Sequence, residues 1–251
     1  MISNTICAQK YGKSIYAGAA NLKKHVKEIN DLNVFPIPDG DTGDNMLLTM
    51  IGGTNVLNDS FTSISQISAA ISNGMLMGAR GNSGVILSQF FDGISIGFKN
   101  VEEATVKDFE NAFKKGVLKA YQSVSDPKEG TMLTVLREAT DYASSLDNNS
   151  ILDFFEAFIK EAKESLSRTP SLLPVLKEAG VVDSGGAGVI YIIDGMKQSI
   201  EGKEFNDVSF ELNNTNDDIN YDLFTENSEL DFGYCTELLV RLQNSKVDIN
   251  S

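Results

Sequence analysis

Residues 34–46 read Val34-Phe-Pro-Ile-Pro-Asp-Gly-Asp-Thr-Gly-Asp-Asn-Met46, a glycine-rich turn that leads directly into an apolar segment. Three carboxylates, those of Asp39, Asp41 and Asp44, lie within six residues of this turn. Carboxylates this close repel one another unless a positive charge neutralises them. Because Mg²⁺ takes oxygen ligands and is commonly held by one or two carboxylates together with substrate phosphates, the turn predicts a metal–phosphate site.

Apolar residues recur at helical spacing on both sides of the turn, and the first 200 residues hold no hairpin signal and no convincing alternating strand. The clearest apolar stripe covers 151–166 and follows Ser150, a suitable N-cap. A proline-containing loop is expected after it. The expected helices span 5–29, 44–57, 63–77, 85–98, 104–124, 130–145, 151–166, 172–179 and 186–200. We therefore predict an all-α core with about eight helices.

Charge and composition divide the chain. The formal net charge is −14, and residues 201–251 carry twelve acidic and three basic residues. The polar, acidic composition of 203–230 is typical of a linker. Apolar, strand-forming residues return after it, so we expect a core domain at 1–202, an acidic linker at 203–230 and the beginning of a truncated middle domain at 231–251. A simple C-terminal tail is the alternative.

The same composition limits location and partners. There is no apolar run of about 20 residues that could span a membrane, and no secretory signal is visible. Two cysteines far apart in sequence suit a reducing compartment, so the expected location is cytoplasmic. A negative chain lacks the basic footprint that nucleic-acid binding requires. A polyanion would have to bind through metal ions and backbone N–H groups.

Three polar, glycine-rich loops each precede an apolar helix: Asp39–Asn45, Gly78–Gly84 and Val182–Gly188. Helix N-termini offer unpaired N–H groups and a positive dipole end, and glycines let the backbone approach a phosphate closely. A nucleoside triphosphate with Mg²⁺ would use all three loops. Arg80 and Arg168 are candidate cations for the phosphate charge, because guanidinium groups match phosphate oxygens.

Other phosphate and metal motifs are excluded. In an EF-hand that starts at Asp39, position 12 would be Met50 instead of the required glutamate. The chain has no Gly-x-x-x-x-Gly-Lys-Ser/Thr loop and no protein-kinase signature set. The single histidine, His25, has no accompanying nucleophile motif. An acceptor that is already ionised, such as a carboxylate, would need no general base.

These residues resemble the nucleotide-binding domain of the dihydroxyacetone kinase family, and within it the N-terminal kinase domain of the bacterial fatty acid kinase catalytic subunit. The resemblance covers roughly residues 1–200. It rests on four segments in the expected order: Asn33–Met46, Gly78–Val85, Glu129–Leu133 and Arg168–Gly186. The segment Phe232–Glu237 is similar to the opening of the middle domain of those proteins.

The resemblance implies an antiparallel barrel of eight helices that binds ATP at one end through two Mg²⁺ ions. It also implies a phosphoryl acceptor that is a fatty acid presented by a separate fatty-acid-binding protein, with an acyl phosphate as product. In the family's pattern Asp39 and Asp41 are metal ligands, and the third ligand is open among Asp44, Asn33 and Asp31. The nucleotide-contacting positions are Thr42, Asn45, Met46, Ser83, Gly84, Thr131, Met132, Asp183 and Gly185.

The leading hypothesis is therefore a Mg²⁺- and ATP-dependent fatty acid kinase domain in which Asp39, Asp41 and Arg168 act in catalysis. One rival is a dihydroxyacetone-type kinase subunit that phosphorylates a small hydroxyl substrate. Another is a non-catalytic module that only binds nucleotide. A homodimer through a missing C-terminal region is a further expectation.

Overall fold

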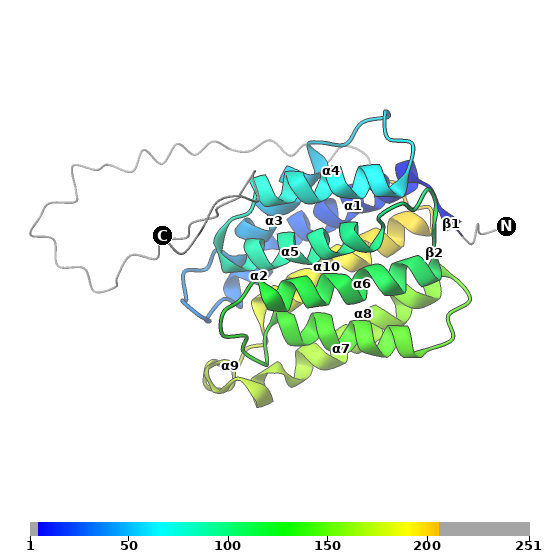
Figure 1. Ribbon diagram of the computed structural model, residues 1–251. Coiled ribbons are helices and arrows are strands. Elements are labelled where there is room, and N and C mark those ends of the chain that lie inside the picture. The colour runs from blue at the N-terminus through cyan, green and yellow to red at the C-terminus, as the bar shows by residue number, and fades with distance from the viewer. Residues whose placement is uncertain (1–4, 206–251) are drawn as a thin grey trace, which may run out of the picture. The chain divides into compact units, whose positions relative to one another are not determined.

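The computed structural model describes residues 5–205, which are mostly helical (Figure 1). Two strands of two residues, β1 (Thr5–Ile6) and β2 (Ala104–Thr105), pair antiparallel, with Thr5 opposite Thr105. The helices in this part of the chain are α1 (Ala8–Lys24), α2 (Val26–Asp31), α3 (Thr42–Thr54), α4 (Ile64–Met77), α5 (Gly81–Gly97), α6 (Val106–Gln122), α7 (Met132–Ser145), α8 (Ile151–Leu172), α9 (Pro174–Ala179) and α10 (Ser184–Ile200).

The long helices lie side by side and alternate in direction along the chain (Figure 1). Helix α5 packs against α6, α7 packs against α8, and α10 returns to pack against α1. The last contact is very close, because a Cβ at Gly195 would lie 2.9 Å from Gly18 Cα. The all-α prediction is confirmed in its main part. The closed eight-helix barrel stays a prediction.

A cluster of buried aromatic rings fills the space between α5, α6 and α8. Phe113 of α6 is central to it, with ring centroids 5.4 Å from Phe90, 5.1 Å from Phe154 and 5.4 Å from Phe158. All three contacts are edge to face, the geometry that the ring quadrupole favours. The periodic apolar stripe recognised in 151–166 supplies two of these rings, so the pattern identified a true core face.

Helix α8 is longer than expected, and the loop predicted after residue 166 is wrong. The helix continues to Leu172 with Pro170 inside it. Proline has no N–H, so it leaves the carbonyl of Leu166 without its helical donor. The hydroxyl of Thr169 donates to that carbonyl at 2.8 Å, which replaces the lost bond and lets the helix continue.

Two further expectations need correction. The single helix predicted over 5–29 is broken at His25, whose ring stacks on Tyr191 of α10 with centroids 3.7 Å apart. The first 200 residues also contain strand, because β1 and β2 pair. Each strand has two residues, which is too short for an alternating pattern to reveal.

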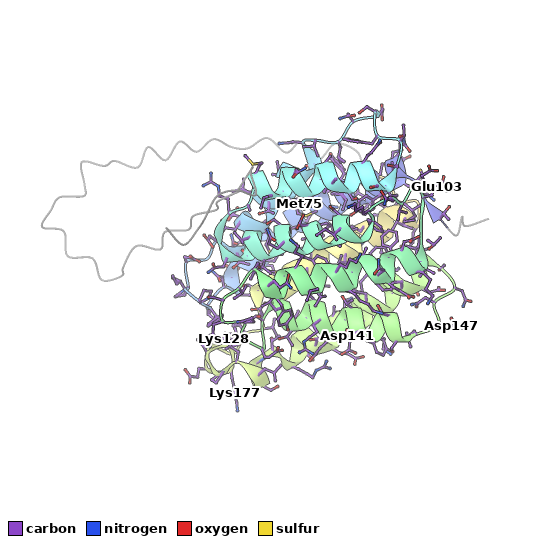
Figure 2. The ribbon with its side chains drawn as sticks, in the orientation of Figure 1. Met75, Glu103, Lys128, Asp141, Asp147 and Lys177 are labelled. Carbon is purple, nitrogen blue, oxygen red and sulfur yellow. The ribbon has the colours of Figure 1, made fainter. Side chains whose placement is uncertain are left out.

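Four connections meet at one end of the helices, which we call the loop end: residues 32–41, 78–80, 123–131 and 173–183. Lys128 and Lys177 lie there, whereas Glu103 and Asp147 lie at the opposite end (Figure 2). Helices α3, α5, α7 and α10 all begin at the loop end, so their N-terminal N–H groups face the same region (Figure 1).

None of the helices within residues 5–205 is both long and apolar enough to cross a membrane. The predicted linker at 203–230 falls outside the described residues except for 203–205. The predicted start of a middle domain at 231–251 falls wholly outside them.

Candidate functional site

The acidic loop ends where α3 begins, and two asparagines near the end of α2 hold it in place. Asn33 donates its side-chain N–H to Asp39 Oδ1 at 2.5 Å. Asn30 donates to Asp44 Oδ2 at 2.7 Å, and its carbonyl oxygen accepts the backbone N–H of Gly43 at 2.7 Å. A Cβ at Gly43 would lie 2.6 Å from Val26 O, so α2 and α3 are in close contact at this point.

Asp41 is the N-cap residue of α3 and lies close to both neighbouring acids. Burial raises the pKa of its carboxyl group, and the negative charges of Asp39 and Asp44 raise it further, while a hydrogen bond from Asn45 opposes the shift. This is the electrostatic pattern of a carboxylate group that a cation would stabilise.

The loop supplies two carboxylates for a metal and leaves the third ligand open. Asp39 is exposed and Asp41 half-buried, whereas the Asp44 carboxylate is held by Asn30. Among residues 5–205, no three His, Cys, Asp or Glu side chains form a group that could hold a metal ion. The donor chemistry fits Mg²⁺ all the same, because two carboxylates together with substrate phosphates are a common Mg²⁺ ligand set.

The second loop brings the start of α5 against the start of α3. Gly81 has φ +57°, and a Cβ there would overlap the side-chain amide of Asn45. A Cβ at Gly84 would likewise overlap the hydroxyl of Thr49. The sequence-predicted residues Ser83 and Gly84 therefore lie in the first turn of α5, beside Asn45.

A buried carboxylate, that of Asp183, lies at the start of α10. Asp183 caps α10 by accepting the N–H of Gly186 at 2.7 Å, and the N–H of Met132 at the start of α7 lies near enough to lower the pKa of the carboxyl group. The residue is 6% exposed, and burial raises the pKa of its carboxyl group to about 6, against the opposing effect of those two N–H donors. Ser184 donates to the hydroxyl of Thr42 at 3.2 Å, which links α10 to α3.

The structure therefore brings most of the sequence-predicted site residues to the same end of the helices. Met46 is buried against α10, because a Cβ at Gly188 would lie 2.5 Å from its sulfur. Thr131 precedes α7, and its hydroxyl donates to Lys128 O at 2.8 Å. A Cβ at Gly185 would lie 3.1 Å from Met132 Cβ, so the starts of α7 and α10 are in contact.

A charged network holds the loop before α7. The carboxylate of Glu129 accepts hydrogen bonds from Thr134 at 2.7 Å and from Arg137 at 2.7 Å. The hydroxyl of Tyr121 donates to the same carboxylate at 3.1 Å and accepts from Arg137 Nε at 3.0 Å. These contacts lower the pKa of Glu129, although burial opposes the change, and they fix the loop that carries Thr131.

The guanidinium group of Arg168 is bound elsewhere. It donates to Glu138 at 2.7 Å and to Glu161 at 2.6 Å, on the outer side of α7 and α8. These two hydrogen bonds raise its pKa. By contrast, no ion pair involves Arg80 within residues 5–205, and this arginine directly precedes α5 at the loop end.

Asn30 is a site residue that sequence reasoning missed. Its side chain touches both the backbone and a carboxylate of the acidic loop. The helix predicted over 5–29 ends before both asparagines, so no sequence pattern linked Asn30 to Gly43 and Asp44, which lie more than ten residues further along the chain.

The fold and the loop end define a helical domain of the dihydroxyacetone kinase type. The chain belongs to the DAK2 domain family, which matches residues 36–198.

Relatives and a solved structure agree with this assignment. The chain is 40% identical to protein YloV of Bacillus subtilis (strain 168), over 98% of this chain and 46% of that protein. It is also 40% identical to an uncharacterized protein of Staphylococcus saprophyticus, over 94% of this chain and 44% of the relative. The chain thus spans under half the length of these relatives.

Among solved structures, the fold is similar to dihydroxyacetone kinase from C. freundii in complex with AMP-PNP and Mg²⁺. The TM-score is 0.58 and the sequence identity 18%, and the match covers 75% of this chain and 33% of the other. At this identity the likeness concerns the fold.

Proposed function

We propose that this domain binds Mg²⁺ and ATP at the loop end and transfers the γ-phosphoryl group to the carboxylate of a fatty acid held by a separate fatty-acid-binding protein. The carboxylate oxygen would bond to phosphorus as the bond to ADP breaks, giving an acyl phosphate. The observation that carries the nucleotide part is the convergence of helix starts next to the Asp39–Asp41 pair. The start of α3, which follows that pair, meets the starts of α5 and α10, and the start of α10 meets that of α7. Membership of the DAK2 family supports a kinase.

Asp39 and Asp41 would hold the metal, with two Mg²⁺ ions as the proposed number. Bound Mg²⁺ would bridge phosphate oxygens and offset the charge that develops during transfer. The likeness to a dihydroxyacetone kinase solved with AMP-PNP and Mg²⁺ supports this cofactor pair. Asn30 and Asn33 would keep the acidic loop in shape before the metal arrives, because each binds one of its carboxylates.

The helix starts would bind the triphosphate. The N–H groups at the first turns of α3 and α5 point toward the loop end, and of these the N–H of Gly43 is already bonded to Asn30. Ser83 and Thr131 add hydroxyl groups there. Gly81 and Gly84 allow the two helix starts to approach each other, so their positive dipole ends act on the same anion.

The cation that faces the phosphates is better assigned to Arg80 than to Arg168. Arg168 would have to break two short hydrogen bonds to carboxylates before it could reach a nucleotide. Arg80 has no such competitor within residues 5–205 and lies one residue before the glycine that packs on Asn45. Its planar guanidinium group suits developing negative charge on phosphate oxygens.

A carboxylate acceptor agrees with the scarcity of side chains at this site that could act as a general base. An ionised carboxylate needs no proton removed before it attacks phosphorus, whereas a hydroxyl group does. The only histidine of the chain stacks on Tyr191 and binds Glu28, and it lies at the break between α1 and α2. The rival, phosphorylation of a small hydroxyl substrate, is favoured by the likeness to dihydroxyacetone kinase.

Titration calorimetry of ATP into this chain, with and without Mg²⁺, tests the nucleotide part. We expect tight binding that depends on Mg²⁺. Failure to bind in both conditions would overturn the proposal of a nucleotide site in this chain.

The acceptor is tested with ATP labelled at the γ-phosphorus. One reaction contains an oleate-loaded fatty-acid-binding protein, and a parallel reaction contains dihydroxyacetone. We expect label in an acyl phosphate. Hydroxylamine should convert this product to an unlabelled hydroxamate and release the label as inorganic phosphate. Transfer to dihydroxyacetone alone would replace our acceptor with the rival one. Binding of ATP without transfer to either acceptor would favour a non-catalytic nucleotide module.

A further inference from the structure

The hydroxyl group of Thr134 is buried in the first turn of α7 and joins two parts of the loop before that helix. It accepts the backbone N–H of Gly130 at 2.8 Å and donates to the carboxylate of Glu129 at 2.7 Å. A hydroxyl group can do both at once, because it has one donor and two acceptor lone pairs. One side chain therefore binds the backbone of one loop residue and the side chain of the residue before it.

Gly130 shows how closely the backbone of this loop is packed. Its φ is +84°, a left-handed conformation that glycine adopts at little cost. The residue is buried, and a Cβ there would lie 2.9 Å from Leu173 Cβ and 3.0 Å from Leu172 Cβ. A buried backbone N–H needs an acceptor within the protein, and Thr134 provides it.

The same loop carries a side chain of the proposed nucleotide site. Thr131 directly follows Gly130, and its own hydroxyl donates to Lys128 O at 2.8 Å. The two hydrogen bonds of Thr134 hold the two residues immediately before Thr131. They therefore set the direction in which the chain enters α7 and the place of the Thr131 hydroxyl.

A charged partner holds Glu129 from the solvent side. Arg137 donates to its carboxylate at 2.7 Å, but the two side chains of this ion pair are 39% and 50% exposed. Exposed ion pairs contribute little to stability, whereas losing the acceptor of a buried N–H leaves that donor without a partner. We therefore expect the hydroxyl of Thr134 to constrain the loop more strongly than the charge of Arg137 does.

We propose that Thr134 is a positioning residue whose hydroxyl group fixes the loop 128–131, and with it Thr131, before any nucleotide binds. Because its side chain is fully buried, Thr134 acts through Gly130 and Glu129 and does not contact the nucleotide itself. The consequence for ATP affinity rests on the proposed function, whereas the consequence for the loop does not.

Thr134→Val and Thr134→Ser form a matched pair, because valine replaces the hydroxyl with a methyl group and serine keeps it. The measurements are hydrogen exchange of the Gly130 amide by NMR in the ligand-free protein, and calorimetry of ATP with Mg²⁺. We expect Thr134→Val to exchange this amide at least tenfold faster and to bind ATP about tenfold more weakly, since a buried donor loses its acceptor. Thr134→Ser should stay within about threefold of wild type in both.

Thr140→Val is the control for the substitution itself. Thr140 lies on the same helix and is also buried, but its hydroxyl has no hydrogen-bond partner within residues 5–205. This variant loses no hydrogen bond, so the exchange of Gly130 and the affinity for ATP should not change.

Four results would overturn the proposal. Unchanged exchange of Gly130 in Thr134→Val would show that other contacts hold the loop. Faster exchange with unchanged ATP affinity would show that the loop does not position the nucleotide site. Equal losses in Thr134→Ser, or in Thr140→Val, would assign the effect to altered packing. If wild type itself failed to bind ATP, the proposed function would fall, while the exchange measurement would still decide whether Thr134 fixes the loop.

Discussion

The side-chain amide of Asn30 donates to Asp44 Oδ2 at 2.7 Å, while its carbonyl oxygen accepts the N–H of Gly43. One residue at the end of α2 thus binds both the carboxylate of Asp44 and the backbone N–H of Gly43 in the first turn of α3. Because Asn33, two residues after the end of α2, also donates to a carboxylate of the loop, that of Asp39, α2 and the turn that follows it support the acidic loop.

Replacing Asn30 with alanine should therefore loosen the loop. We expect the free energy of unfolding to fall by about 1 to 2 kcal/mol, since Gly43 loses its acceptor. Affinity for ATP with Mg²⁺ should fall about tenfold, the lower limit for loss of a residue that orients metal ligands. Urea denaturation and calorimetry measure the two effects. Asn73→Ala, on the exposed side of α4, is the control, and an equal effect there would contradict the assignment.

Asp41→Asn should separate binding from stability. The substitution removes one proposed metal ligand, so Mg²⁺-dependent affinity for ATP should fall roughly a hundredfold or more, which corresponds to about 2.7 kcal/mol. It also removes one of the charges that repel Asp39 and Asp44, so the metal-free protein should be no less stable. Near-normal affinity in this variant would refute the metal assignment. Asp59→Asn, on an exposed loop, should change neither quantity.

We expect different effects on kcat when each of the two candidate arginines is replaced by alanine. Arg80→Ala should lower kcat about a hundredfold at saturating ATP, as expected for loss of a charge-stabilising group. Arg168→Ala breaks an exposed pair of salt bridges, so it should cost about 1 kcal/mol or less in stability and change kcat by no more than about threefold. Steady-state kinetics of the two variants, measured at a temperature at which both remain folded, show which arginine acts in catalysis. A larger kcat loss in Arg168→Ala would restore that residue as the catalytic cation.

The free energy of unfolding should depend on pH because of Asp183. Its pKa is about 6 in the folded protein against an ordinary value of 3.8, so the folded state binds the proton more tightly than the unfolded state does. Stability then rises as pH falls from about 6 to about 4, and the ionised form costs roughly 3 kcal/mol above pH 6.

Denaturation of wild type and Asp183→Asn at several pH values isolates this contribution, because the other carboxyl groups are common to both proteins. Relative to the variant, wild type should gain stability as the solution is acidified through pH 6. A difference that stays constant between pH 4 and pH 8 would contradict the buried, ionisable state of Asp183.

Most of the helices could be predicted because each has a continuous apolar stripe, as in 151–166, that must face a core. The errors come from specific side-chain contacts, one within a helix and one between distant helices. The hydroxyl of Thr169 carries α8 through Pro170, and the ring of Tyr191 accompanies the break at His25. Neither contact can be read from a hydrophobic pattern.

The site residues likewise fall into those that a sequence pattern reveals and those that depend on contacts between helices. Asp39 and Asp41 could be found because they lie only two residues apart in the sequence, and their assignment as metal ligands stays a prediction. The burial of Asp183 beside Met132 arises only when α7 and α10 pack together, which no sequence pattern shows. Arg168 looked available as a cation because its partners, Glu138 and Glu161, lie on two helices whose facing sides the sequence does not reveal.

The close contact between α1 and α10 has a consequence for synthesis of the chain. The apolar face of α1 emerges from the ribosome first, but the helix that covers it begins roughly 160 residues later, about ten to thirty seconds at ordinary translation rates. During that interval Ala17, Gly18 and Asn21, which pack directly on α10 in the finished domain, lack that cover. A nascent chain released before residue 184 should therefore be a substrate for chaperones and proteases.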